Sequence, residues 1–306
     1  MGLFSKREAC PICGGKIKGL FPWKIEGQQI CGDCHGSVDL PEGMENNMTL
    51  GDFRAYMAFR EENALLKQKF VATEKVDFGV FDTKFMFDMN NGLLCMDKHL
   101  NKTIFESGHI KSFVIKEDSA PLYEGSAAGL TCYVSDVPDR AMAMTPQIEH
   151  HLAQVQMRRN LERMADRMDD GKINNSNTHR IPTFDIPEPF KNFNVEIYFD
   201  HPYWSVFRAD MSGPTFNNTY PDVNDYLREY NNSVATMDQL ARAFMELAFP
   251  GAGEQVAGGV AAPGAAAAPA ASVDAVEEIK RYKGLLDQGI ISDEDFAAKK
   301  RQLLGI

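Results

Sequence analysis

The sequence predicts an α+β protein of several domains. We expect a small cysteine-bound N-terminal module, a small antiparallel β-barrel or sheet closed by a helix, a flexible linker and a C-terminal helical hairpin. Three observations predict this order. Four of the six cysteines form two C-x-x-C pairs near the N-terminus. Short segments with period-two apolar residues fill the middle of the chain and precede an amphipathic helix. A stretch rich in alanine, glycine and proline then separates them from two short helical segments.

Residues 1–40 contain both C-x-x-C pairs, and this spacing predicts a zinc ribbon. Two such knuckles aim four thiolates at one point, which suits a tetrahedral structural ion and leaves no open position for chemistry. Four thiolates also suit iron, and that alternative stays open. Metal binding supplies much of the folding free energy, because so short a segment buries little surface. The predicted zinc ligands are Cys10, Cys13, Cys31 and Cys34.

The remaining candidate metal ligands are interpreted differently. Cys95 and Cys132 lie in apolar contexts, so we expect them to be buried strand residues. His35 follows Cys34 directly, but four thiolates already complete the site. We therefore expect His35 at the surface or beside the ligands rather than on the metal.

Residues 41–72 contain the predicted connecting helix. Thr49 is a plausible N-cap, and Asp52 three residues later completes a variant of the capping box. Apolar residues then recur at three- and four-residue spacing without glycine or proline.

Residues 73–249 read as an antiparallel β domain that a C-terminal helix closes, with Thr236 as the expected start of that helix. Turn signals separate the short apolar runs. A helical insertion interrupts them near 138–192, and its helix, expected from Pro146 to Met168, carries two apolar stripes and several arginines. One stripe could dock on the β domain and leave the methionine-rich stripe free for a partner, or both stripes could be buried. Asp222 and Asp225 read as turn and cap residues.

Residues 250–273 are the predicted linker, and residues 274–306 the predicted hairpin. Gly289 ends the first tail helix and Ser292 caps the second. About 33 residues bury too little surface to be stable alone, so the tail must dock onto something. The apolar residues expected to bind that partner are Ile279, Tyr282, Leu285, Leu286, Ile290, Ile291, Phe296, Leu303 and Leu304.

Composition and motifs disfavour several classes of function. The formal net charge of −11 disfavours binding to nucleic acid or anionic lipid, although a local basic patch could still do either. No membrane-length apolar segment and no apolar leader is visible, so we expect a cytoplasmic protein. The common catalytic motifs are missing as well, so we expect no enzyme.

Three parts of the chain resemble known families. The tail resembles a SHOCT domain, found at the C-terminus of many bacterial and phage proteins, through its Leu-Leu-x-x-Gly-Ile-Ile-Ser turn at Leu285–Ser292, then Phe296 and Lys300–Leu304. The front end is similar to an uncharacterised bacterial zinc-ribbon family, whose members often carry a SHOCT tail and a pleckstrin-homology-like middle domain. Residues 73–249 resemble that middle domain in their order of short strands with a final helix. These resemblances imply oligomerisation or nucleic-acid binding, and they bring no catalytic residues.

Together these observations favour a non-enzymatic adaptor or assembly protein. Its tethered hairpin would bind a second copy of the chain or another protein. Two alternatives remain. One is nucleic-acid binding through Lys16, Lys18, Lys24 and Trp23 of the ribbon and the arginines of the insertion helix. The other is peripheral membrane binding.

Overall fold

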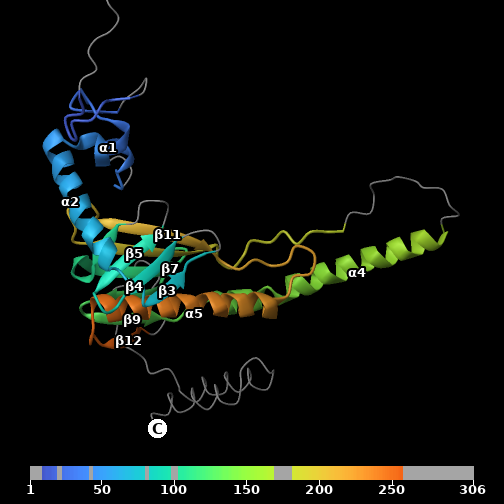
Figure 1. Cartoon of the computed structure of the whole chain (residues 1–306). Helices are drawn as coiled ribbons and strands as arrows, with labels where there is room; N and C mark the ends of the chain where they lie inside the picture. The colour runs from blue at the N-terminus through green and yellow to red at the C-terminus, as the bar shows by residue number, and fades with distance from the viewer. Residues whose placement is uncertain are drawn as a thin grey trace, which may run out of the picture. The chain divides into compact units, whose positions relative to one another are not determined.

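The computed structural model of the protein describes residues 9–18, 23–40, 44–79, 83–97, 103–168 and 181–257 (Figure 1). They fall in one compact unit, Met1–Val260, and a second unit comprises Ala261–Ile306. The expected hairpin, its partner-binding residues and most of the expected linker therefore lie outside the described residues. The described part is a mixed α+β fold, as the sequence predicts, and it contains several sheets.

The N-terminal module consists of short elements. Strands β1 (Lys24–Ile25) and β2 (Gln28–Gln29) form an antiparallel hairpin. Glu26 and Gly27 turn the chain with φ angles of 50° and 79°, and two positive φ angles in a two-residue loop match the twist of a hairpin. Helix α1 (Gly32–Gly36) and the 3-10 turn η1 (Met44–Asn47) follow. The small core contains Ile17, Ile25, Ile30, Leu50 and Phe53 beside three cysteines.

Helix α2 (Leu50–Lys69) connects this module to the β domain. The Thr49 side chain accepts the Asp52 N–H and the Asp52 carboxylate accepts the Thr49 N–H, which confirms the expected capping box. Further along, the buried Asn63 carboxamide donates to the Ile104 carbonyl at 2.6 Å and accepts from the Ile104 N–H at 3.0 Å. Both bonds hold α2 against the edge of the first sheet.

The first sheet is a four-stranded antiparallel meander in the order β3-β4-β5-β6. Its strands are β3 (Glu74–Asp77), β4 (Lys84–Asp88), β5 (Leu93–Asp97) and β6 (Ile104–Glu106). Phe85 and Phe87 alternate with Lys84 and Met86 on β4, so the two rings share one face of this sheet. That face packs toward the main core.

The second sheet has six strands in the order β11-β10-β7-β8-β9-β12. Five of them are antiparallel to their neighbours, while β12 runs parallel to β9. The 3-10 turn η2 (Ser107–His109) leads into this sheet from β6. The strands are β7 (Ile110–Glu117), β8 (Ala120–Ser126), β9 (Gly129–Tyr133), β10 (Asn192–Phe199), β11 (Val206–Ser212) and β12 (Glu254–Ala257).

Helix α5 (Val223–Ala248) packs against β3 and β4 of the first sheet and against β7, β8 and β9 of the second (Figure 1). The Phe244 ring lies 5.2 Å from Phe87 and 5.0 Å from Phe113, measured between ring centroids, so it contacts both sheets. The sheets also contact each other directly through Phe105 and Phe199, whose rings stack at 4.7 Å. Although α5 is 26 residues long, no helix among the described residues is long and apolar enough to cross a membrane.

The sequence left open a barrel or a sheet, and among the described residues the β domain forms two separate sheets and no barrel. No strand pairing joins the four-stranded sheet to the six-stranded sheet. Each sheet covers its apolar face with the other sheet and with α5, so burial is achieved without closing the strands into a ring. A helix does close the β domain, as expected.

Two element boundaries differ from the sequence expectation. Helix α5 begins after Asp222, which accepts from the Asn224 and Asp225 N–H groups, and not at Thr236. Burial of Tyr226 and Tyr230 stabilises the earlier turns, which are otherwise polar. In addition, residues 254–257 of the expected linker form β12, because β9 offers an open sheet edge.

The insertion between β9 and β10 contains α3 (Val137–Ala143) and α4 (Thr145–Met168). The chain returns as an extended segment, residues 181–191. Glu117 at the end of β7 anchors the start of the insertion, because it accepts hydrogen bonds from Ser135 Oγ and from Tyr230 Oη of α5. Burial raises the pKa of Glu117 even though both hydrogen bonds favour its charged form.

The tight packing around Gly125 predicts that adding one methyl group there will destabilise the protein. An added Cβ would lie 2.2 Å from the buried Phe113 ring and 2.9 Å from Met245 Sδ. We expect Gly125→Ala to lower the free energy of unfolding by about 1–3 kcal/mol, because overpacking moves rings of the core. Urea denaturation measures this. Gly108→Ala is the matched control, since nothing lies within 4 Å of its Cβ position. Equal stability of the two variants would contradict the packing described for β7 and β8.

Glu117 and Glu196 predict pH dependences of opposite sign. The raised pKa of Glu117 means that its contribution to stability falls as pH rises through the interval between the unfolded and folded pKa values. Hydrogen bonding to Tyr198, then to Lys116, lowers the pKa of Glu196, so its contribution is lost as pH falls. As pH rises, we expect the free energy of unfolding of Glu117→Gln to increase relative to that of the natural protein. For Glu196→Gln we expect it to decrease relative to the natural protein. Urea unfolding across the acid range checks both, and matching slopes would contradict this assignment.

Candidate metal centre

The four cysteines of the two C-x-x-C pairs converge on one point. Their Sγ atoms all lie within 4.8 Å of one another, with Cys10 and Cys34 4.0 Å apart and Cys13 and Cys31 3.5 Å apart. A tetrahedral zinc ion with Zn–S bonds of about 2.3 Å requires S···S separations of about 3.8 Å. The cluster therefore fits one tetrahedral metal ion, and it is the only such group of three or more metal-ligating side chains among the described residues.

Local backbone geometry explains why each pair turns inward. In the first knuckle, the Cys10 N–H donates to the Gly15 carbonyl at 2.8 Å and the Gly15 N–H points at Cys13 Sγ at 3.4 Å. Gly14 adopts a φ of 71°, which a side chain would strain. In the second knuckle, Cys31 is the N-cap of α1, and its Sγ accepts the Cys34 N–H at 3.4 Å. These N–H groups stabilise negative charge on the sulfurs.

The thiol pKa values show how the cluster resists ionising as a group. Burial raises the pKa of Cys34, and hydrogen bonds to the thiols of Cys13 and Cys31 raise it further. Burial acts on Cys10 in the same direction, but hydrogen bonds from backbone N–H groups outweigh it and lower the pKa of Cys10 to about 6. Four thiolates at these separations repel one another unless a cation balances their charge.

Helix α2 and the ribbon hold the site in place. Phe53 of α2 is fully buried against the ribbon, and its ring lies 5.7 Å from the Trp23 ring. Arg54 Nη2 donates to the Pro11 carbonyl inside the first knuckle at 3.0 Å. His35 is exposed and its ring lies 4.9 Å from Trp23, so it stays beside the cluster and is not part of it. The structure thus places His35 as expected.

A cluster of aromatic side chains joins the end of β10 to α2, and sequence reasoning missed it. The Tyr203 ring lies 5.1 Å from Tyr56 and 5.2 Å from Phe59, and His201 lies 5.1 Å from Phe59. Burial, then the nearby His109, lowers the pKa of His201 to about 4, so its ring is neutral at physiological pH. The run His-Pro-Tyr-Trp at 201–204 is a local signal for this contact, but a strand turn explains it equally well from sequence.

The remaining cysteines take structural positions. Cys95 on β5 is buried, as expected. Cys132 lies on strand β9 as expected but is only half-buried, and its thiol lies 3.6 Å from Glu254 Oε1. Burial and the neighbouring Glu254 carboxylate raise the pKa of Cys132 to about 11, which makes it a poor nucleophile at neutral pH.

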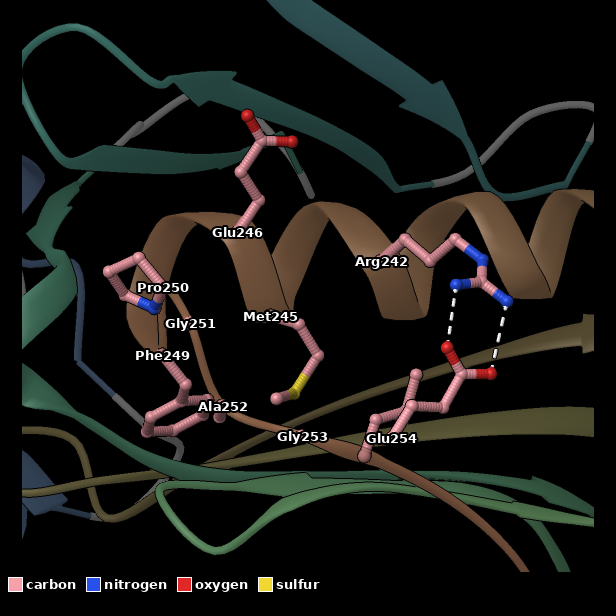
Figure 2. A pocket seen from close by; sticks show the side chains of 10 residues that line it. Arg242, Met245, Glu246, Phe249, Pro250, Gly251, Ala252, Gly253 and Glu254 are labelled. Atoms are coloured by element: carbon pink, nitrogen blue, oxygen red, sulfur yellow. Dashed lines mark hydrogen bonds and ion pairs between the residues drawn. The ribbon is translucent and has the colours of Figure 1, made fainter.

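An open cavity of about 350 Å³ lies where α5 ends and the chain turns into β12 (Figure 2). Arg242 forms two bonds to the Glu254 carboxylate, at 3.0 and 3.3 Å, and a third contact to Asp238 at 2.8 Å. The rest of the lining comes from Leu130, Met245, Glu246 and residues 249–253. The described lining holds no paired acid, nucleophile and base, so we interpret this corner as the anchor of β12.

Comparison with known proteins bears on the tail. Residues 277–304 match the family described as Short C-terminal domain, SHOCT, which confirms that resemblance. No curated protein and no solved structure matches the chain. The predicted partner-binding residues, Ile279 to Leu304, lie in this matched segment and outside the described residues.

The metal centre predicts the effect of losing one ligand. We expect Cys31→Ser to reduce bound metal from one ion per chain to near zero and to unfold the ribbon, because metal binding stabilises so small a core. Metal analysis gives the first readout. Trp23 emission gives the second, in a Trp204→Phe background that leaves a single tryptophan.

Cys132→Ser is the matched control for this experiment, because it changes a cysteine outside the cluster. It should keep one metal ion per chain and unchanged Trp23 emission. Full metal occupancy in Cys31→Ser would contradict the four-cysteine site.

Proposed function

We propose that the chain is a non-enzymatic adaptor or assembly protein. Its ribbon holds structural zinc through Cys10, Cys13, Cys31 and Cys34, and its tethered C-terminal hairpin binds a second copy or another protein. The SHOCT match at 277–304 is the observation that carries this proposal. A segment of that length buries too little surface to stand alone, so its apolar residues need a partner.

The metal centre supports a structural role for the ribbon. Four thiolates fill a tetrahedral site, so no position is left for a reacting water or substrate. Zinc is the ion we propose, because two C-x-x-C knuckles with N–H groups directed at sulfur suit a borderline-soft d10 ion. Iron in the same site would colour the protein and zinc would not, which distinguishes the two.

The β domain supports a binding rather than a catalytic scaffold. We include in the proposal its likeness to a pleckstrin-homology fold. A four-stranded antiparallel sheet, a second antiparallel sheet and a C-terminal helix packed on both support this likeness. Strands β10 and β11 and the α3–α4 insertion are additions to that plan.

Nucleic-acid binding is the alternative with an observation in its favour. Lys16, Lys18 and Lys24 are exposed and form no ion pair with any described carboxylate. Phosphate binding by these lysines would weaken steeply with salt. Undetectable binding of a labelled duplex at low salt would exclude it.

The tail predicts a change of mass in solution. Light scattering after size exclusion compares the full chain with a chain that ends at Val260, the boundary of the first unit, so that β12 is retained. We expect the full chain to have at least twice the monomer mass and the shortened chain to be monomeric. Phe296→Glu in the full chain should act like the truncation, and Lys283→Glu is its matched control.

Two results would count against this proposal. Equal masses for all four proteins would exclude self-assembly through the tail and leave a different protein as its partner. If the tail also captures no specific protein in a pull-down that Phe296→Glu abolishes, the proposal fails.

A further inference from the structure

Helix α4 has one face packed on the β domain and one face left open. On the packed face, Ile148 and Val155 are 4% and 1% exposed. His151 lies between them; its Nε2 is 3.2 Å from the Thr219 carbonyl and its ring lies 5.3 Å from Phe184. These contacts hold the first half of α4 in place.

The open face carries large apolar side chains at regular spacing. Met157, Leu161 and Met164 are 66%, 46% and 59% exposed. Their separations of four and three residues are those of the a and d positions of a heptad, which line the seam between two paired helices. Figure 1 shows this part of α4 extending past the end of α5, with no described element alongside it.

The same face continues toward the N-terminus as a groove. Gln147, His150 and Gln154 occupy the preceding positions of the same three- and four-residue pattern. They line a groove of about 460 Å³, whose opposite wall is the extended segment 183–186. Gln154 Nε2 lies 2.9 Å from His150 Nε2, so polar groups border the groove next to the apolar stripe. A single partner helix could contact both the groove and the apolar stripe.

Charge indicates which partner fits. The segment Met157–Met164 contains three arginines and one glutamate, although the whole chain carries a net charge of −11. Arg159 is engaged with the Tyr220 ring at 5.1 Å, whereas Arg158 and Arg163 form no ion pair with a described carboxylate. With Leu161 at an a position, Arg158 falls at e, beside the stripe, and Arg163 falls at c, farther around the helix. Both are available to acidic groups. A second copy of α4 would instead bring together two segments with the same excess of positive charge.

We infer that residues 147–164 of α4 are a docking surface for an amphipathic helix of another protein. That helix would carry apolar residues at heptad spacing, flanked by aspartate or glutamate. Methionine side chains suit this role, because they adapt to the shape of an apolar partner. This surface consists of residues 147–164 and none of the tail, so the inference does not depend on the function proposed for the hairpin.

Binding of designed peptides to the full chain tests this proposal. The probe is a fluorescein-labelled synthetic helix of about three heptads with leucine at a and d and glutamate at e and g. The matched probe has lysine at e and g. Fluorescence anisotropy should show binding of the glutamate peptide at least about tenfold tighter than that of the lysine peptide, because the net positive charge of the segment Met157–Met164 favours an acidic partner.

Point variants locate the binding. Leu161→Gln should weaken the glutamate peptide about tenfold or more, because it removes the centre of the stripe. Leu65→Gln is the matched control: Leu65 is a 58% exposed leucine on another helix, and its loss should change nothing. The double variant Arg158→Glu with Arg163→Glu should reverse the preference toward the lysine peptide. Both leucines are exposed, and circular dichroism checks that every variant is folded.

Three outcomes would overturn the proposal. One is equal binding of both peptides, or no loss in Leu161→Gln. The second is a dimer that Leu161→Gln dissociates and the Val260 truncation does not, which would make the surface a contact between copies. The third is displacement of the bound glutamate peptide by a DNA duplex or by anionic vesicles. Leu161→Gln should not change the mass difference between the full chain and the chain that ends at Val260. Failure of the docking surface and failure of the adaptor proposal are therefore distinguishable.

Discussion

The packing of Phe244 where the two sheets meet is the contact on which the β domain depends. Its ring touches Phe85 and Phe87 of one sheet and Phe113 of the other, at 5.0–5.6 Å between centroids. Edge-to-face ring contacts add specific geometry to the burial of large apolar surface. Because α5 is fixed by this contact, its C-terminus is fixed as well. Arg242 then binds Glu254 and sets where β12 joins the sheet, just before the chain leaves the described residues.

A second series of contacts links the four-cysteine cluster to the same β domain. Two knuckles hold the thiols, Phe53 and Arg54 tie them to α2, and Asn63 fixes α2 to the edge strand β6. Without these contacts, the small N-terminal module would be a separate domain that is joined to the β domain only by the connecting chain. Its attachment through one helix means that metal loss would also remove the support for the first half of α2.

Much of this organisation could be predicted because its causes are local. C-x-x-C spacing, the Thr49–Asp52 capping box and the alternating apolar residues act within a few residues of each other, so the sequence shows them directly. The division of α4 into a packed and an open stripe was also visible as periodicity. Which stripe is covered could not be read from periodicity. It depends on Phe184 and Thr219, which approach from distant parts of the chain.

By itself, the sequence determined the order of the parts, the four thiols that converge and the likeness of the tail to a SHOCT domain. Only the tertiary structure decided that the strands form two sheets instead of a barrel, that α5 starts at Asp222 and that the start of the linker becomes β12. The physical reason is how far apart along the sequence the interacting residues lie. Spacing and caps are set by neighbouring residues. Sheet edges, buried tyrosines and covered helix faces depend on surfaces brought together by long-range packing.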